Sequence, residues 1–377
     1  MWRRVIRRGD GMRGAAEGVL RLIDRPFDLA LEFAQETVCF PLLLHSCPRK
    51  PTHMSRLSRS LRCALFACLV VLSAGVATPA QAWAQAKSGE SSGKNEPVNV
   101  VLRTKDNLAL KATYYQSSRG KDAPVVVLLH MKDGNRFIWQ SEGGFANRLH
   151  KEGYAVLTVD LRGHGESRGD GAAGAAQGDK KARRELKKGD LVAMYEGDME
   201  AVNKFLLERH QAEEFNMNKT AFVGPEMGAT VAVYAAFRDW NKPPYADAPV
   251  DSGRQTPRGQ NVRALVLISP QQNLQGLGLA QPLKGLGAPM LGISCLVAVA
   301  QKDGQDKGQA KKTYDQVASA PGSDQRMYFR DFPGTARGTE LLGKKTKLED
   351  TMVNFLGKHL RDLEIPWTDR RPANERE

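Results

Sequence analysis

The chain has 377 residues, of which 41% are hydrophobic and 26% are charged. This composition is typical of a globular protein and excludes a disordered or fibrous chain. Lysine and arginine number 55 against 42 aspartates and glutamates, which gives a formal net charge of +13. An excess of this size suggests nucleic acid or an anionic membrane as a partner, depending on where the charge lies.

The charge and the cysteines are both concentrated near the N-terminus. Residues 1–86 carry a net charge of +6, and the much longer remainder carries +7. Four of the five cysteines also lie in residues 1–86, so the remainder, which has only Cys295, cannot form an internal disulfide. A net charge of +7 is small for a segment of this length, so we expect no nucleic-acid partner.

The segment that begins at Met54 resembles a bacterial secretory signal peptide. Three arginines precede an apolar run, Cys63 to Ala77, and two small-x-small cleavage sites follow it. We therefore predict a signal peptide at 54–86 and a periplasmic or secreted protein. A membrane span needs about 20 apolar residues, so an uncleaved anchor is the alternative and the one expected membrane contact. Residues 1–53 are interpreted as a misannotated or disordered extension, and 87–96 as a linker.

From residue 97 onward the sequence predicts alternating strands and helices in one domain, 97–377. Two short alternating strands come first, joined by a hairpin turn, and β-branched runs then predict six buried strands. The predicted strands are 98–102, 108–115, 124–129, 155–159, 220–223, 264–268, 293–299 and 326–331. Helical periodicity predicts helices at 143–151, 191–209, 229–237, 310–318 and 348–360. This order predicts an α/β protein with an eight-stranded, mostly parallel sheet and helices on both faces.

Two turns of the sequence carry distinctive residues. His130 and Met131 follow the third predicted strand, and residues 160–167, after the fourth, read Asp-Leu-Arg-Gly-His-Gly-Glu-Ser. These turns resemble two loops of the α/β-hydrolase fold family. The first stands where that family has a His-Gly oxyanion loop, with Met131 in place of the usual glycine, and the second matches the family's Asp-x-Arg-Gly-His-Gly-x-Ser turn.

Three further positions stand where that family carries its catalytic groups. Residues 224–228, Gly-Pro-Glu-Met-Gly, lie between a strand and a helix, where the nucleophile elbow Gly-x-Ser-x-Gly belongs. The resemblance thus places Glu226 at the nucleophile and Met227 directly after it. Asp303 follows the seventh strand, at the position of the triad acid, and Arg337 follows the eighth, at the position of the histidine.

The five segments occur in the family's order over about residues 97–362. The chain therefore resembles compact members such as dienelactone hydrolases and serine esterases or peptidases. The resemblance implies an α/β-hydrolase fold, and the short connection at 270–289 leaves room for little or no lid domain.

Two of the three catalytic positions carry side chains that cannot perform the family's chemistry. A Ser-His-Asp triad needs a hydroxyl nucleophile and a neutral imidazole base. Glu226 has no such proton to give up, and Arg337 stays protonated up to about pH 12. The two residues would face each other, so we predict an ion pair between Glu226 and Arg337 with Asp303 beside it; independent loss of both groups is the alternative.

Three functions remain open from the sequence. The first is an exported pseudoenzyme that binds a small molecule or a protein partner, with Arg337 available to hold an anionic group. The second is an active carboxylic-ester hydrolase with non-standard catalytic residues; Ser167 and Ser269 follow strands and lie near the expected site. The third is a basic surface protein that binds polyanions through the lysine and arginine run at 180–188. No metal-ligand cluster or phosphate-binding glycine loop is present, so no metal or cofactor is predicted.

Overall fold

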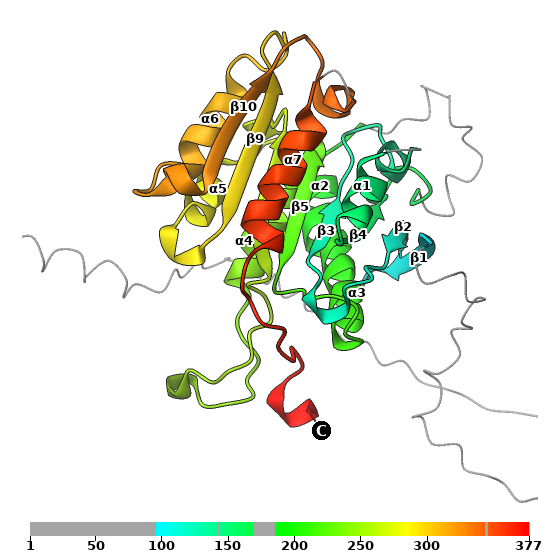
Figure 1. Cartoon of the computed structure of the whole chain (residues 1–377), viewed down its shortest axis with the longest axis vertical. Coiled ribbons are helices and arrows are strands. Elements are labelled where there is room, and N and C mark those ends of the chain that lie inside the picture. The colour runs from blue at the N-terminus through cyan, green and yellow to red at the C-terminus, as the bar shows by residue number, and fades with distance from the viewer. Residues whose placement is uncertain (1–95, 142–143, 169–184, 344–345, 377) are drawn as a thin grey trace, which may run out of the picture. The chain divides into compact units, whose positions relative to one another are not determined.

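The computed structural model describes residues 96–141, 144–168, 185–343 and 346–376 (Figure 1). The predicted extension and signal peptide, and the predicted linker apart from its last residue, Glu96, lie outside these ranges, as does the part of the basic run before residue 185. Within the described ranges, no helix has the length and apolar character needed to cross a membrane.

One eight-stranded sheet forms the centre of the described domain. Its strands are β1 Val98–Arg103, β2 Ala109–Tyr115, β3 Val125–Leu128, β4 Ala155–Val159, β5 Thr220–Pro225, β6 Val262–Ile268, β9 Ser294–Ala300 and β10 Met327–Phe332. They lie in the order β1-β2-β4-β3-β5-β6-β9-β10. β2 pairs antiparallel with both β1 and β4, and every other pairing is parallel. The predicted mostly parallel sheet is confirmed.

Helices cover both faces of this sheet. They are α1 Phe145–Lys151, α2 Lys188–Ala193, α3 Met199–Gln211, α4 Met227–Asn241, α5 Ala280–Leu286, α6 Gln309–Val317 and α7 Leu348–Leu356. α1 and α7 share one hydrophobic cluster, whereas α3, α4, α5 and α6 share another. Figure 1 shows α7 crossing one face of the sheet. Along β3, Val125 and Val127 belong to one cluster and Val126 and Leu128 to the other, because successive strand side chains point to opposite faces.

The connection between β6 and β9 is short. It contains a small hairpin, β7 Asn273–Leu274 with β8 Leu277–Gly278, then α5 and a 3₁₀ turn, so the structure agrees with the expectation of little or no lid. Two π-helical turns, Met194–Asp198 and Gly357–Arg361, extend the helical segments. The 3₁₀ turns are Gly120–Asp122, Arg136–Trp139, Val250–Ser252, Pro289–Leu291, Ser323–Gln325, Gly338–Leu341 and Ala373–Glu375.

Candidate functional site

Glu226 occupies a sharp turn between β5 and α4. Its backbone has φ 46° and ψ −106°, a conformation that a side-chain-bearing residue rarely adopts. Close packing holds the turn on both sides. A Cβ atom on Gly224 would lie 2.3 Å from the carbonyl carbon of Gly228, and one on Gly228 would lie 2.7 Å from the carbonyl oxygen of His130. The two glycines therefore give this segment the geometry of a nucleophile elbow, with Glu226 at its apex.

The Arg337 guanidinium lies between two carboxylates. Its Nε atom contacts Oε1 of Glu226, and its Nη1 atom donates to Oδ2 of Asp303 at 2.7 Å. The side chains of Arg337, Glu226 and Asp303 are only 11%, 16% and 2% exposed. The predicted ion pair with Asp303 beside it is thus present, and we refer to these three residues as the ion cluster.

The fold brings the ion cluster together from three separate connections. Glu226 follows β5, Asp303 follows β9 and Arg337 follows β10. β5, β9 and β10 are parallel within the sheet, so their carboxyl ends meet at one edge. This edge is where open α/β sheets place their ligands and catalytic groups.

Ser269 supports the loop that carries Arg337. It follows β6 with φ 46°, and its hydroxyl oxygen accepts a hydrogen bond from the backbone N–H of Gly338 at 3.0 Å. Ser269 is fully buried, so it forms part of the wall of the site. Ser167 is also buried, and its hydroxyl oxygen accepts from the backbone N–H of Lys111 at 2.8 Å. Neither serine has a histidine as a hydrogen-bond partner among the described residues.

The ion cluster has a net negative charge, because it contains two carboxylates and one guanidinium. An anion that approached Arg337 would also approach Glu226 and Asp303, which already occupy its Nε and Nη1 atoms. This geometry argues against the expectation that Arg337 holds an anionic group. The sequence indicated that Asp303 would lie near Arg337. The structure shows that both Asp303 and Glu226 contact the guanidinium directly, so its positive charge is already neutralised.

His130 is held as a neutral side chain beneath the elbow. Its Nε2 atom accepts from the backbone N–H of Leu161 at 3.0 Å, so Nδ1 carries the proton and donates to the carbonyl oxygen of Met131 at 2.8 Å. Burial is the main cause that lowers the pKa of His130 to about 3, and the nearby His164 contributes. Both ring nitrogens are engaged, so His130 cannot serve as a general base for a reaction at residue 226.

The two methionines of the site lie in different environments. The Sδ atom of Met131 lies 3.4 Å from the hydroxyl of Thr339, so the Met131 side chain packs against the loop that follows Arg337. Met227 begins α4, and its side chain is buried in the hydrophobic core. Met131 therefore contributes to the wall of the site, whereas Met227 contributes its backbone at the helix start.

Arg136 is a buried cation that sequence reasoning missed. Its Nη1 and Nη2 atoms contact Asp160 and Glu166 at 2.5 and 2.6 Å, and its backbone N–H donates to Asp160 at 2.6 Å. A Cβ atom on Gly165 would lie 2.3 Å from the Asp160 carboxylate, which explains the glycine in this turn. Because Arg136 lies 24 residues from Asp160, no local pattern indicates the contact.

His210 lies near the C-terminal end of α3 and is buried there, although histidines near helix ends are commonly solvated. The side chain is fully buried, and its Nε2 atom lies 2.8 Å from the carbonyl oxygen of Thr368. The ring also packs against Trp367, with centroids 4.8 Å apart. The C-terminal tail covers the end of α3, a tertiary contact that helical periodicity does not reveal.

The strand order, the antiparallel β2 and the elbow after β5 together decide the fold. The chain has an α/β-hydrolase fold. Within the described ranges, no group of three or more histidine, cysteine, aspartate or glutamate side chains is arranged to hold a metal ion.

The known proteins named here resemble this chain only at a low level of similarity. No family model matches the sequence, and no curated protein matches it. A dienelactone hydrolase from Anabaena variabilis is similar, with 13% identity over 71% of this chain and 100% of that one and a TM-score of 0.43. An esterase from Pyrococcus furiosus has 16% identity over 72% and 96% of the two chains, with a TM-score of 0.45. An esterase from Pyrobaculum calidifontis has 15% identity over 70% and 85%, with a TM-score of 0.45. Similarity at this level says nothing about the activity of this chain.

Proposed function

We propose that this protein is a non-catalytic member of the α/β-hydrolase fold that binds a small molecule or a protein partner. The observation that supports this most directly is the Arg337 guanidinium, which bridges Glu226 and Asp303 where the fold places a catalytic triad. An arginine in contact with two carboxylates is a structural cation and cannot accept a proton from a nucleophile.

The alternative of a carboxylate nucleophile meets a chemical obstacle in this geometry. If Glu226 attacked an ester carbonyl, the ester's C–O bond would break, the alcohol would leave and a mixed anhydride with Glu226 would form. Water must then hydrolyse this anhydride, and that step needs a general base. Arg337 occupies the position of the base. His130, which contacts the elbow through its backbone, has both ring nitrogens hydrogen-bonded to the backbone.

The experiment compares ester hydrolysis by the full-length chain and by matched variants. p-Nitrophenyl acetate is the probe, and the variants are Glu226→Ala and the double variant Glu226→Ser/Arg337→His. We expect the parent and Glu226→Ala to show the same background rate. The double variant restores the residue types of a triad on an unchanged elbow, so we expect it to release p-nitrophenol above that background.

Turnover by the parent that Glu226→Ala abolishes would overturn the proposal and establish an active hydrolase with a carboxylate nucleophile. Titration of the burst phase separates a single acylation from true turnover, because a trapped acyl-enzyme releases one equivalent of p-nitrophenol and then stops.

We also propose that the protein is exported. The support is the sequence of residues 54–86, with its arginines, apolar run and small-x-small sites. Expression of the full-length chain in a bacterial host, followed by fractionation and N-terminal sequencing, tests this. We expect a periplasmic form that begins within residues 83–87. A cytoplasmic product that retains residue 54 would contradict the proposal.

A further inference from the structure

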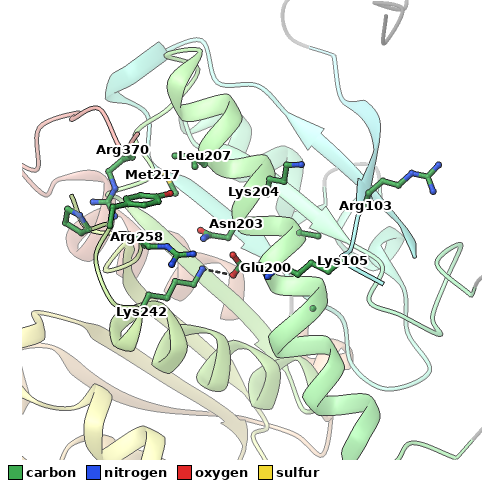
Figure 2. A pocket seen from close by; sticks show the side chains of 14 residues that line it. Arg103, Lys105, Glu200, Asn203, Lys204, Leu207, Met217, Lys242, Arg258 and Arg370 are labelled. Atoms are coloured by element: carbon green, nitrogen blue, oxygen red, sulfur yellow. Dashed lines mark hydrogen bonds and ion pairs between the residues drawn. The ribbon is translucent and has the colours of Figure 1, made fainter. Parts of the chain in front are cut away.

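A cationic pocket lies beside α3, and none of its lining residues belongs to the ion cluster. It has a volume of about 210 Å³ and opens between α3, the end of α4, the segment before β6 and the C-terminal tail (Figure 2). Met217, which lines the pocket, precedes β5, whereas Glu226 follows it. Because β5 has six residues, roughly 20 Å of strand separates Met217 from Glu226.

The lining of the pocket has a large excess of positive charge. Its cations are Arg103, Lys105, Lys204, Lys242, Arg258 and Arg370. Glu200 is the one acidic residue among the lining side chains, and it pairs with Lys242 at 2.6 Å. Figure 2 shows the Arg103 side chain extending away from the others, but five cations against one carboxylate still leave the lining positively charged, and a pocket of this kind attracts anions.

The cations of the pocket differ in how far they are already engaged. Arg370 is buried and donates to Oδ1 of Asn218 at 3.0 Å and to a backbone carbonyl. Lys204 lies 4.0 Å from Glu208. Arg258, in contrast, has no carboxylate within ion-pair distance among the described residues, and its guanidinium lies 5.2 Å from the ring centroid of Tyr245. The guanidinium of Arg258 is therefore available to a ligand.

A neutral donor stands beside these cations. The side-chain amide of Asn203 has no hydrogen-bond partner within the described ranges, although the residue is only half-exposed and lines the pocket. Figure 2 shows Asn203, Arg258 and Lys242 extending into the same part of the pocket from three different segments. A ligand there would meet the Arg258 guanidinium, the Asn203 amide and the Lys242 ammonium, which is paired with Glu200.

We propose that this pocket binds a compact anion that carries a phosphoryl group. Guanidinium forks and ammonium groups together match the several acceptor oxygens and the double charge of a phosphate monoester. The volume is below the roughly 300–1,000 Å³ of pockets for drug-sized ligands, which limits the ligand to a small molecule or a headgroup. Leu207, Met217 and Pro257 supply apolar surface for the carbon part of the ester.

The experiment measures binding of phenyl phosphate and of inorganic phosphate to the full-length chain by isothermal titration calorimetry at fixed ionic strength. We expect saturable binding with one site. Arg258→Gln should weaken it at least tenfold. Arg254→Gln is the matched control, because Arg254 is an exposed arginine in the same segment that does not line the pocket, and it should leave the affinity unchanged.

A second variant separates a built site from a diffuse charge effect. Asn203→Ala keeps the charge of the pocket, and we expect it to weaken binding of phenyl phosphate severalfold. Equal weakening by Arg258→Gln and Arg254→Gln, with no effect of Asn203→Ala, would overturn the proposal, as would the absence of saturable binding to both probes.

Binding to lipid vesicles distinguishes two sources of the phosphoryl group, a lipid headgroup and a soluble phosphate ester. Sedimentation with phosphatidylglycerol vesicles, against phosphatidylcholine vesicles, tests a lipid headgroup. Binding to phenyl phosphate without binding to either vesicle supports a soluble ester, and binding to both phenyl phosphate and phosphatidylglycerol supports a lipid source. Vesicle binding that Arg258→Gln leaves intact would contradict this pocket as the site. The proposal does not depend on the loss of catalysis, because the residues that line this pocket are distinct from those of the ion cluster.

Discussion

Replacement of Arg337 by methionine tests whether the ion cluster stabilises the fold. The substitution keeps a long side chain but leaves Glu226 and Asp303 facing each other without a cation. Asp303 is 2% exposed, so its carboxylate has little access to water. We expect the variant to lose stability because two like charges then remain in a largely buried site.

The size of this loss follows from the contacts. At an effective dielectric constant of about 20, unit charges about 4 Å apart attract by about 4 kcal/mol, and Arg337 makes two such contacts. The cost of burying the charges offsets part of this gain, and removal of one partner from a buried pair costs about 3–5 kcal/mol. Glu226 and Arg337 retain 16% and 11% exposure, so we expect the lower end, about 3 kcal/mol.

Urea unfolding followed by tryptophan fluorescence measures the difference, with Arg148→Met as the matched control. Arg148 Nη1 lies 2.7 Å from Asp350 Oδ1, the same separation as between Arg337 and Asp303, but the two side chains are 40% and 56% exposed. An exposed pair contributes less than about 1 kcal/mol. The double variant Arg337→Met/Asp303→Asn should recover part of the loss. Equal destabilisation by Arg337→Met and Arg148→Met would refute the argument.

Two further predictions concern structural turns and pH. Gly165→Ala should destabilise the protein by about 2–3 kcal/mol more than Gly163→Ala in urea unfolding, because both glycines have positive φ but only Gly165 would place a Cβ atom against Asp160; similar costs for the two variants would count against this reason. Burial lowers the pKa of His130 to about 3, so the unfolded state takes up a proton near pH 6.5 and the native state does not. The stability that this histidine contributes is thus complete above pH 6.5 and falls as the pH is lowered toward 3, by at most about 1.4 kcal/mol per pH unit. We expect His130→Gln to show a shallower loss of stability than the parent between pH 7 and 5, and identical slopes would contradict the assignment.

Local sequence patterns predicted the strands well, because the apolar residues that are buried in the sheet are also residues that favour an extended backbone. The predicted strand at 155–159 coincides with β4, a fully buried run with three β-branched residues among five. The predicted helix at 191–209 was less accurate, because a π-helical turn, Met194–Asp198, interrupts it. Asp198 at the end of this turn accepts from Arg162, which is 36 residues away. Helical periodicity contains no information about such a contact.

The ion cluster was predictable because each member follows a strand that the sequence identifies. Ordered motifs placed Glu226, Asp303 and Arg337 at one edge, and their opposite charges predicted the contact. The cationic pocket was not predictable in this way. Arg258 and Arg370 belong to segments without regular secondary structure, and Lys242 directly follows α4. The packing of the C-terminal tail brings Arg370 near α3, and the pair with Glu200 holds Lys242 there. No motif marks any of these residues.

The guanidinium of Arg337 also has a mechanical consequence. Its ion pairs with Glu226 and Asp303 link the connection after β10 to the connections after β5 and β9, at an edge where loops commonly move independently. Opening any one of the three requires breaking a charged contact with another. We therefore expect backbone amides in the three connections to exchange their hydrogens as one cooperative unit, so that this edge of the sheet behaves as a closed surface.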